Sequence, residues 1–440
     1  MVDLPSSIKQ GEQARLFPVV SDGSREQRLT SLFLALLTQI PELGSRLFSG
    51  YGPRFGARTR IDAFTEVVFK NQSEKVDRPD GFLEINTSQK SWSALVEAKI
   101  GRASLDQQQV ERYLELARAN NLDAVITISN QFVARPDHSP LIVSKRLTNK
   151  VNLLHWSWMS ILTHCKVLQL NEAVADKEQS FLLAEFIRHL EHPSIGVEQF
   201  SQMNKGWKDL VSAIANGETL RKTSPEIEAS VGAWFEEERD LGLLLSRTVG
   251  EHVALVIERK LRSDPKERLK VECQRFAENQ KLTSTFRVPD TADDITVEAD
   301  ATRKSIAVSM MLKAPQDKKS TKARVNWLLR MLKEDHPNLL IRAHWPGRMP
   351  PSQASLASLR EEPSEIDAGN GAAPHSFQVC LIEDLGRRFA GSKTFIEDLE
   401  RVVPEFYSVA GQHLRAWQAP PPKPVKTEPD VESEYVISTD

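Results

Sequence analysis

The chain has 440 residues, of which 40% are hydrophobic and 27% are charged, and its formal net charge at pH 7 is −3. These values are ordinary for a soluble globular protein of two or three domains, and they exclude a strongly basic, histone-like binder of nucleic acid. Because no apolar run approaches the ~20 residues of a membrane-spanning helix and the N-terminus lacks the layout of a signal peptide, we expect a cytoplasmic protein without membrane contact.

The cysteines and the charge distribution narrow the class further. Cys165, Cys273 and Cys380 are scattered and form no CxxC pair, which predicts buried, reduced thiols and argues against a structural zinc site. Residues 1–170 carry 21 Lys and Arg against 17 Asp and Glu, whereas the rest of the chain is acidic. Attraction to a phosphate backbone would therefore favour the N-terminal part.

The first domain is expected to span residues 23–170, after a loosely ordered lead-in at residues 1–22. Ser24 is a candidate N-cap for a first helix, in which leucines recur at helical spacing and which ends before Pro41. The later elements are strands at residues 61–69, 81–86 and 92–100, a helix at 105–120, strands at 124–129 and 151–156, and a helix that begins near Ser157. This order predicts a mixed α/β domain.

The rest of the chain divides into a helical connector, a second domain and a tail. Residues 171–270 form the connector, with helices predicted at 181–192, 197–216 and 226–261. Residues 271–417 form the second domain, of α/β (α+β) class, with strands predicted at 283–288, 295–299, 305–312, 338–345 and 377–382 and a helix at 319–333. We expect a mobile loop at 350–376 and a disordered, Pro-rich tail at 418–440.

Three residues of the first domain have the chemistry of a centre that hydrolyses phosphodiesters. Asp80 opens one predicted strand, and Glu97 and Lys99 lie two residues apart near the end of the next, so that both side chains point to the same face. The Ala98 carbonyl between them is free to face a metal ion. If the two strands are neighbours, two carboxylates, one carbonyl and one ammonium surround a single point. Mg²⁺ accepts such ligands and keeps several waters.

Other interpretations of these carboxylates stay open at the level of sequence. Asp62 and Glu66, on the preceding strand, compete with Asp80 as the first ligand, and Glu66 and Glu84 can instead face solvent or support the centre through hydrogen bonds. Pro-Asp-Gly is also a common turn signal. Asp80 is preferred because Gly81 follows it and permits close approach of backbone and ligand.

Gln109 and Tyr113 add a second pattern, because they lie four residues apart and hence on one face of the predicted helix. Together with Asp80, Glu97 and Lys99 they resemble the motifs of the PD-(D/E)xK, restriction-endonuclease-like nuclease superfamily. The Gln-x-x-x-Tyr element resembles that of the RecB-like members. The resemblance covers residues 20–165 and leaves the remainder of the chain without a relative.

This resemblance implies a restriction-endonuclease-like mixed sheet flanked by helices and a nuclease that uses Mg²⁺ or Mn²⁺ to cut DNA. It implies that Asp80, Glu97 and the Ala98 carbonyl bind the metal and that Lys99 orients or activates water and offsets phosphate charge. In the family, the helix that carries Gln109 and Tyr113 packs beside the metals, and its Gln helps to position metal-bound water or DNA.

Two further groups have a functional and a structural interpretation side by side. Glu26 opens the first helix, where related nucleases carry an acidic residue near the metals, but the helix dipole also explains an acid at this position. Arg54, Arg58 and Arg60 lie in a glycine-containing loop and either hold a DNA backbone or form a solvated loop. The aromatic residues His155, Trp156, Trp158 and His164 are expected to be structural.

The leading hypothesis is a cytoplasmic, Mg²⁺-dependent deoxyribonuclease with a role in defence or repair and with an appended C-terminal domain. That domain leaves open a homodimer or a protein partner. Two alternatives compete with this hypothesis: a catalytically silent DNA- or protein-binding module of the same fold, and a stress-related interaction protein that acts through its C-terminal half. A mere scaffold has no need to hold the like charges of Asp80 and Glu97 together, which favours the enzyme.

Overall fold

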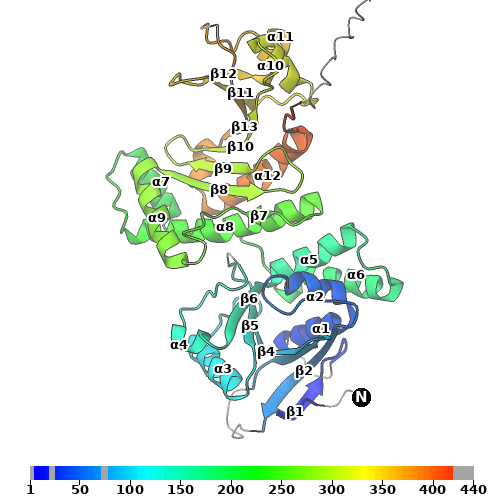
Figure 1. The fold of residues 1–440 in the computed structure, drawn as a ribbon. Coiled ribbons are helices and arrows are strands. Elements are labelled where there is room, and N and C mark those ends of the chain that lie inside the picture. The colour runs from blue at the N-terminus through cyan, green and yellow to red at the C-terminus, as the bar shows by residue number, and fades with distance from the viewer. Residues whose placement is uncertain (1–3, 19–24, 71–77, 134, 370, 420–440) are drawn as a thin grey trace, which may run out of the picture.

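The computed structural model describes residues 4–18, 25–70, 78–133, 135–369 and 371–419, which form two units that each contain one β-sheet (Figure 1). The N-terminal unit, coloured from blue to cyan-green in Figure 1, holds the first sheet, and the green-to-red unit holds the second. The predicted N-cap Ser24, and the predicted tail beyond its first two residues, lie outside the described residues.

The first sheet is mixed and, within the described residues, has six strands. They lie side by side in chain order: β1 (Ile8–Gln13), β2 (Arg60–Phe69), β3 (Gly81–Asn86), β4 (Ser91–Ala98), β5 (Ala124–Ser129) and β6 (Asn152–Ser157). Strands β1 to β4 pair antiparallel, whereas β4, β5 and β6 run parallel. Parallel neighbours need a crossover, and a helix supplies it between β4 and β5. The predicted mixed α/β class is confirmed.

Strand β1 corrects the expectation of a loosely ordered lead-in. Ile8 is buried and lies opposite Phe69 on the neighbouring strand. The other five residues of β1 are exposed or half-buried, so no alternating apolar pattern marks this strand in the sequence. An edge strand can be held by backbone hydrogen bonds and a single apolar contact, which is why the sequence does not reveal it.

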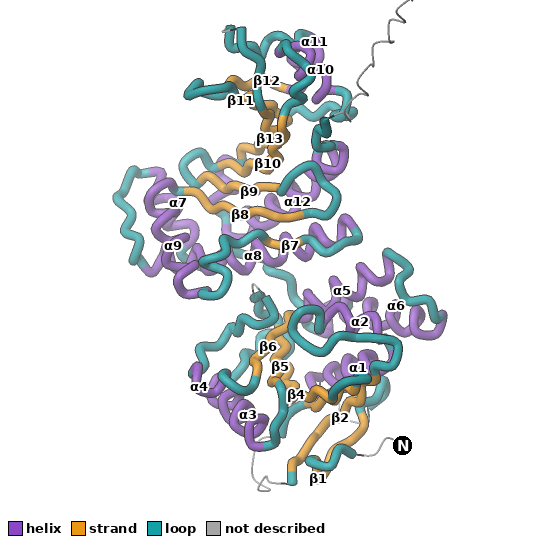
Figure 2. Tube along the Cα trace, in the orientation of Figure 1, coloured by secondary structure: helices purple, strands orange, loops and turns teal. Residues whose placement is uncertain are grey.

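Helices cover both faces of the first sheet (Figure 2). One face packs against α1 (Arg25–Gln39), α2 (Pro41–Leu47), α5 (Trp158–Leu170) and α6 (Lys177–Glu191), and the other against α3 (Gln107–Ala119) and α4 (Lys145–Thr148). Successive residues of β4 enter the two cores in turn: Leu95 joins the core under α3, and Val96 joins the core under α1. By the same alternation Glu97 belongs to the α3 face, at the point where the strand ends.

The second unit contains an antiparallel sheet flanked by helices. Its strands follow the spatial order β12-β11-β13-β10-β9-β8-β7, with bounds β7 Ala254–Leu255, β8 Lys281–Arg287, β9 Ile295–Asp300, β10 Ser305–Lys313, β11 Leu339–His344, β12 Ser352–Ser355 and β13 Ser376–Asp384. Its helices are α7 Trp207–Ala215, α8 Pro225–Val249, α9 Pro265–Asn279, α10 Thr321–Leu329, α11 Leu356–Glu361 and α12 Ser392–Val409. Trp207 and Ile227, which fall in the expected connector, share one hydrophobic core with this sheet.

Two helices expected in the connector are shorter in the structure. The helix predicted at 226–261 ends at Val249, because Gly250 adopts a left-handed φ of 74° and closes it. The helix predicted at 197–216 begins only at Trp207.

The loop predicted to be mobile, at 350–376, contains regular structure. It includes β12, which pairs with β11, and α11, for which Ser355 accepts the capping hydrogen bond from the Ser358 N–H. Leu356 and Leu359 lie three residues apart on α11 and are fully buried in the core. The surrounding Ser, Pro and acidic residues hide this short apolar pair in the sequence.

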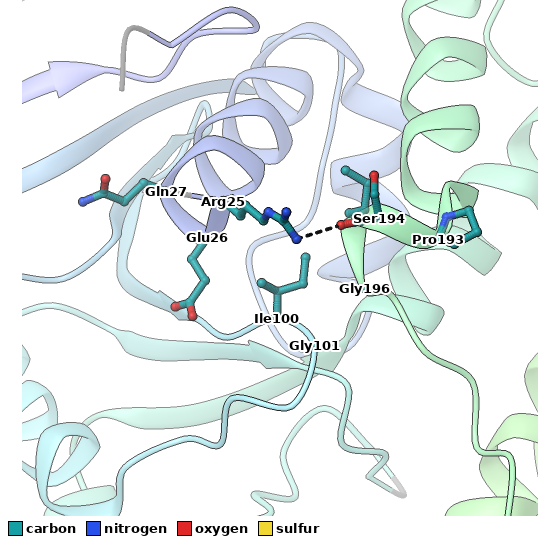
Figure 3. A pocket seen from close by; sticks show the side chains of 9 residues that line it. Arg25, Glu26, Gln27, Ile100, Gly101, Pro193, Ser194 and Gly196 are labelled. Carbon is teal, nitrogen blue, oxygen red and sulfur yellow. Dashed lines mark hydrogen bonds between the residues drawn. The ribbon is translucent and has the colours of Figure 1, made fainter. Parts of the chain in front are cut away.

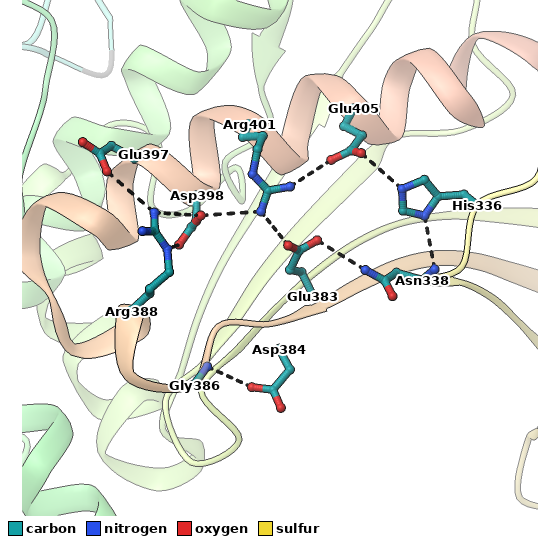
Figure 4. Close-up of polar contacts among 10 residues, drawn as sticks. All are labelled: His336, Asn338, Glu383, Asp384, Gly386, Arg388, Glu397, Asp398, Arg401 and Glu405. Atoms are coloured by element: carbon teal, nitrogen blue, oxygen red, sulfur yellow. Dashed lines mark hydrogen bonds and ion pairs between the residues drawn. The ribbon is translucent and has the colours of Figure 1, made fainter.

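A network of polar contacts ties α12 to β13 (Figure 4). Arg401 donates to Glu383 on β13 at 2.6 Å and to Glu405 on its own helix at 3.2 Å, and His336 contacts Glu405 at 3.1 Å. Because these side chains are partly exposed, each pair contributes on the order of 0–1 kcal/mol. The network fastens the helix to the sheet.

Two expectations about the whole chain have structural outcomes. Cys165, Cys273 and Cys380 are buried and free of disulfides, which confirms the prediction of buried thiols. No helix of the described ranges has both the length and the apolar content needed to cross a membrane.

Candidate metal centre

The antiparallel pairing of β3 and β4 brings Asp80 and Glu97 together. Gly81, the first residue of β3, lies opposite Val96, so the residues on either side of this pair are neighbours across the strands. The Ala98 N–H donates a hydrogen bond of 2.9 Å to Oδ2 of Asp80, which fixes that carboxylate against the end of β4. The condition that the sequence analysis placed on this site, adjacent strands, is met.

The ammonium group of Lys99 joins the cluster. Its Nζ donates to Oε1 of Glu97 at 2.7 Å, to Oε2 of Glu26 at 3.1 Å and to the Ala98 carbonyl at 3.3 Å. The Lys99 carbonyl in turn accepts a hydrogen bond from the indole of Trp158 at 2.9 Å. Glu26 comes from the first turn of α1, so residues from two helices and two strands converge on one point.

Burial dominates the electrostatics of the two strand carboxylates. Burial raises the pKa of Asp80 to about 6, against the lowering effect of the Ala98 hydrogen bond and the Lys99 charge. Burial and, next, the charge of Asp80 raise the pKa of Glu97 to about 7. For Lys99, burial lowers the pKa, but the hydrogen bond and charge of Glu97 outweigh it, so the pKa lies above its ordinary value. Burial therefore makes ionisation of both carboxylates less favourable in the folded protein than in water.

The donor set fits a hard divalent cation. Glu97 is only 1% exposed, and its Oε2 has no hydrogen-bond partner, which leaves a buried acceptor that a cation would satisfy. In the part of the chain that the structure describes, no group of three or more His, Cys, Asp and Glu side chains has metal-binding geometry. An ion at this point would rest on Asp80, Glu97, the Ala98 carbonyl and water, a set that Mg²⁺ accepts.

Two polar residues extend the centre across the sheet, and the sequence analysis had assigned neither to it. Thr127 on β5 lies in register with Glu97, and His155 on β6 lies in register with Thr127. The His155 ring bonds the Thr127 hydroxyl through Nδ1 at 2.9 Å and the Gln131 carbonyl through Nε2 at 3.0 Å. A carbonyl only accepts, so Nε2 carries the proton and Nδ1 accepts from Thr127. Burial lowers the pKa of His155 to about 4, which keeps the ring neutral.

Gln109 and Tyr113 support the centre from α3. The Gln109 amide donates to the Tyr113 hydroxyl at 3.1 Å, and that hydroxyl donates to the Arg78 carbonyl at 2.9 Å. Arg78 lies two residues before Asp80, so the pair holds the backbone that leads into the metal-binding strand. Tyr113 is buried in the core under α3. The Gln109–Tyr113 motif therefore acts on Asp80 indirectly, through the hydrogen bond from Tyr113 to the Arg78 backbone carbonyl.

The competing carboxylates occupy other positions. Asp62 forms an ion pair with Arg60 at 2.9 Å. Glu66 accepts a hydrogen bond from the Gln27 amide at 2.8 Å, and its charge raises the pKa of Asp80 after the effects of burial and of Glu26. Glu66 therefore lies near Asp80 and bonds α1 through Gln27.

The arginine loop lies between α2 and β2, and its members differ in availability. Arg54 and Arg58 are exposed, whereas Arg60 is engaged by Asp62. An exposed arginine can reach a phosphate oxygen, so Arg54 and Arg58 keep the predicted capacity to hold DNA.

A pocket of about 590 Å³ opens beside the centre (Figure 3). Its walls come from the start of α1, with Arg25 and Glu26, from the Ile100–Gly101 turn after β4, and from residues 193–196 after α6. Arg25 donates to the Ser194 carbonyl at 3.4 Å, and Asn130 bonds both the Gly101 and the Gly196 carbonyls. The pocket places solvent-accessible space next to Glu26, whose Oε2 accepts from the Lys99 ammonium.

No protein-family model, curated protein or solved structure matches the chain. The function is therefore argued from the centre itself.

Proposed function

We propose that the chain is a Mg²⁺- or Mn²⁺-dependent deoxyribonuclease of the PD-(D/E)xK type, with its active site at Asp80, Glu97 and Lys99. The observation that carries the proposal is the convergence of a buried carboxylate (Glu97), a half-buried carboxylate (Asp80) and one ammonium at the end of β4. Such a cluster costs folding free energy, because burial and like charge oppose ionisation, and a cation would offset that cost.

Each residue has a distinct task in this proposal. Asp80, Glu97 and the Ala98 carbonyl would hold the metal ion, and the ion would supply an acidic bound water and neutralise charge on the phosphate. Lys99 provides an ammonium that can hold a water or a phosphate oxygen next to the carboxylates. Glu26, at the mouth of the pocket, holds the Lys99 ammonium in place at 3.1 Å.

The other motif residues act by positioning. Tyr113 bonds the Arg78 carbonyl and thereby sets the backbone on which Asp80 is carried. Gln109 orients the Tyr113 hydroxyl. Arg54 and Arg58 would contact the DNA backbone. The restriction-endonuclease-like fold, a defence or repair role, a cytoplasmic location and a homodimeric or protein-binding C-terminal unit belong to the same proposal.

The proposal is tested by incubating the purified chain with linear, circular and single-stranded DNA in Mg²⁺, in Mn²⁺ and in EDTA. Lys99→Ala is compared with Lys90→Ala, a matched change at an exposed lysine just before β4. Cleavage should require the metal, survive in the Lys90 variant and be lost in the Lys99 variant. Cleavage that persists in EDTA, or in Lys99→Ala, rejects the site.

A catalytically silent module of the same fold is the second candidate, and one observation favours it. The Lys99 ammonium bonds Glu97, Glu26 and the Ala98 carbonyl at once, so a cation already neutralises the oxygens that a metal would need. Under this alternative the chain binds DNA without cutting it. Filter binding in EDTA combined with no cleavage in Mg²⁺ or Mn²⁺ would select it.

A further inference from the structure

A second cavity lies where the two units meet, away from the pocket beside Glu26. Its volume is about 620 Å³, within the range of ligand-binding pockets. Its walls come from α2, β6, α5 and residues 132, 133, 135 and 136 of the first unit and from α8 and residues 252–262 of the second. Both units therefore contribute to it.

The cavity carries an excess of positive charge. Among the described residues that line it, the charged side chains are four arginines and one carboxylate: Arg46, Arg135, Arg239, Arg262 and Glu238. The charge of Glu238 is already neutralised by Arg268, which does not line the cavity. Arg268 reaches the two oxygens of Glu238 at 2.7 and 2.9 Å, and Ser284 donates to Glu238 at 2.7 Å. Arg135 is neutralised by Asp137, which accepts from it at 2.9 and 2.7 Å, so the surplus of guanidinium groups rests on Arg46, Arg239 and Arg262.

Arg239 is the clearest member of this set. Its side chain is 10% exposed, its Nη2 donates no hydrogen bond, and the nearest carboxylate oxygen, Oε1 of Glu238, lies 3.6 Å away. Burial lowers the pKa of Arg239 to about 10, in spite of the opposing effect of Glu238. A buried guanidinium with an unused donor costs free energy unless an acceptor satisfies it, and an anion in the cavity would do so.

Other lining residues agree with an anionic, partly aromatic ligand. Trp156 is 2% exposed, and its indole N–H has no acceptor. The rings of His164 and His252 lie 6.5 Å apart with an angle of 23° between their planes. The pKa of His164 is lowered to about 4, first by burial and then by His252 and Arg46. Burial also lowers the pKa of His252. Both rings are therefore neutral hydrogen-bonding groups that lie near positive charge. Tyr51 presents its ring to Arg135 at 5.9 Å.

We propose that this cavity binds a small phosphate-bearing ligand of the nucleotide class, held by Arg239 and Arg46 through its phosphate and by the aromatic wall through its base. The surplus of guanidinium groups selects the phosphate, since arginine pairs bidentately with phosphate oxygens. The volume and the half-buried rings of Tyr51 and His164 leave room and stacking surface that an inorganic ion would not use. The proposal does not rest on the proposed nuclease activity, and the cavity shares with the metal centre only the neutral His155 among the residues described for both.

The test is calorimetric titration of the full chain in EDTA with AMP, GMP, inorganic phosphate and adenosine. A mononucleotide should bind, and adenosine and inorganic phosphate should each bind at least about tenfold more weakly. Arg239→Gln should weaken mononucleotide binding by about ten- to a hundredfold, because a charge-assisted hydrogen bond is lost. Arg348→Gln, at an exposed arginine outside the cavity lining, should leave the affinity unchanged. If circular dichroism shows that the Arg239 variant is unfolded, Arg46→Gln carries the same expectation.

Five outcomes would overturn the proposal. Absence of binding by any mononucleotide rejects the site, and equal binding of adenosine rejects a phosphate-directed one. Binding of inorganic phosphate as tight as that of AMP rejects the nucleotide class. If a folded Arg239→Gln variant binds AMP with unchanged affinity, the ligand binds elsewhere. If a short single-stranded oligonucleotide displaces AMP at a lower concentration than AMP itself requires, the natural ligand is nucleic acid.

Discussion

The substitution Glu97→Gln should make the metal-free protein more stable at high pH, although it removes a charged partner of Lys99. Glutamine imitates the protonated carboxyl in size and polarity, so the variant isolates the free energy of ionising Glu97 in the fold. Raising the pKa of Glu97 from 4.5 to about 7 corresponds to roughly 3 kcal/mol of unfavourable free energy for the ionised form in the folded state. Burial of a side chain that is 1% exposed is the main cause.

The sign of the pH dependence follows from linkage. A carboxyl whose pKa is raised on folding carries no penalty below its unfolded pKa of 4.5 and the full penalty above its folded pKa of about 7. Wild type should therefore lose stability relative to Glu97→Gln as pH rises from 4.5 to 7, and the gap should reach up to about 3 kcal/mol and then stay constant.

Urea denaturation in EDTA at pH 5 and pH 8, followed by tryptophan fluorescence, measures this gap. Trp92, Trp156 and Trp158 lie in the core of the first unit and report on it. Saturating Mg²⁺ or Mn²⁺ at pH 8 should stabilise wild type and leave Glu97→Gln unmoved, because a bound cation favours the ionised form. If the two proteins show the same difference in stability at pH 5 and pH 8, Glu97 ionises normally and the account of the centre is wrong.

The remaining predictions concern the supports of the centre. Tyr113→Phe should cost about 1 kcal/mol and slow cleavage, because the partly buried Arg78 carbonyl loses its donor. Tyr407→Phe on α12 should change stability by less than about 0.5 kcal/mol. Equal effects of the two substitutions in denaturation would contradict the positioning role of Tyr113. Gly81→Ala should cost about 1–3 kcal/mol, because the added Cβ would lie 2.4 Å from a methyl carbon of buried Leu34. Gly56→Ala has open space around its Cβ and should leave stability unchanged. An unchanged stability of Gly81→Ala would show that α1 can shift away from β3 at little cost. Arg58→Gln should reduce the slope of log affinity for DNA against log salt by about one, and an unchanged slope would remove this arginine from the DNA contact.

Much of the first unit could be predicted from local pattern. Residues 124–129, Ala-Val-Ile-Thr-Ile-Ser, are rich in apolar and β-branched residues and form β5, and the strand predicted at 81–86 has the same bounds as β3. The approach of Asp80 to Glu97 was also predictable, because the two strands are consecutive and consecutive strands commonly pair.

Other features depend on contacts that a single sequence does not display. The alignment of Glu97, Thr127 and His155 requires the register of three parallel strands, which crossovers separate in the chain. A threonine in an apolar strand and a histidine in the next are individually compatible with an ordinary core, so neither carried a signal. The cavity at the junction depends on how α8 packs against the first unit. The spacing of apolar residues along the chain does not predict that packing.

The most direct test of the central claim is the rate of DNA cleavage in Mg²⁺ by wild type, Glu97→Gln and Glu84→Gln. Glu84 is a matched control, because it lies on the neighbouring strand and its contact is Ser91 at 3.4 Å, near the exposed end of the hairpin. We predict metal-dependent cleavage by wild type and Glu84→Gln, and a loss of at least about a hundredfold in Glu97→Gln. Equal rates in wild type and Glu97→Gln, or the same rate with and without metal, would contradict a hydrolytic centre at the end of β4.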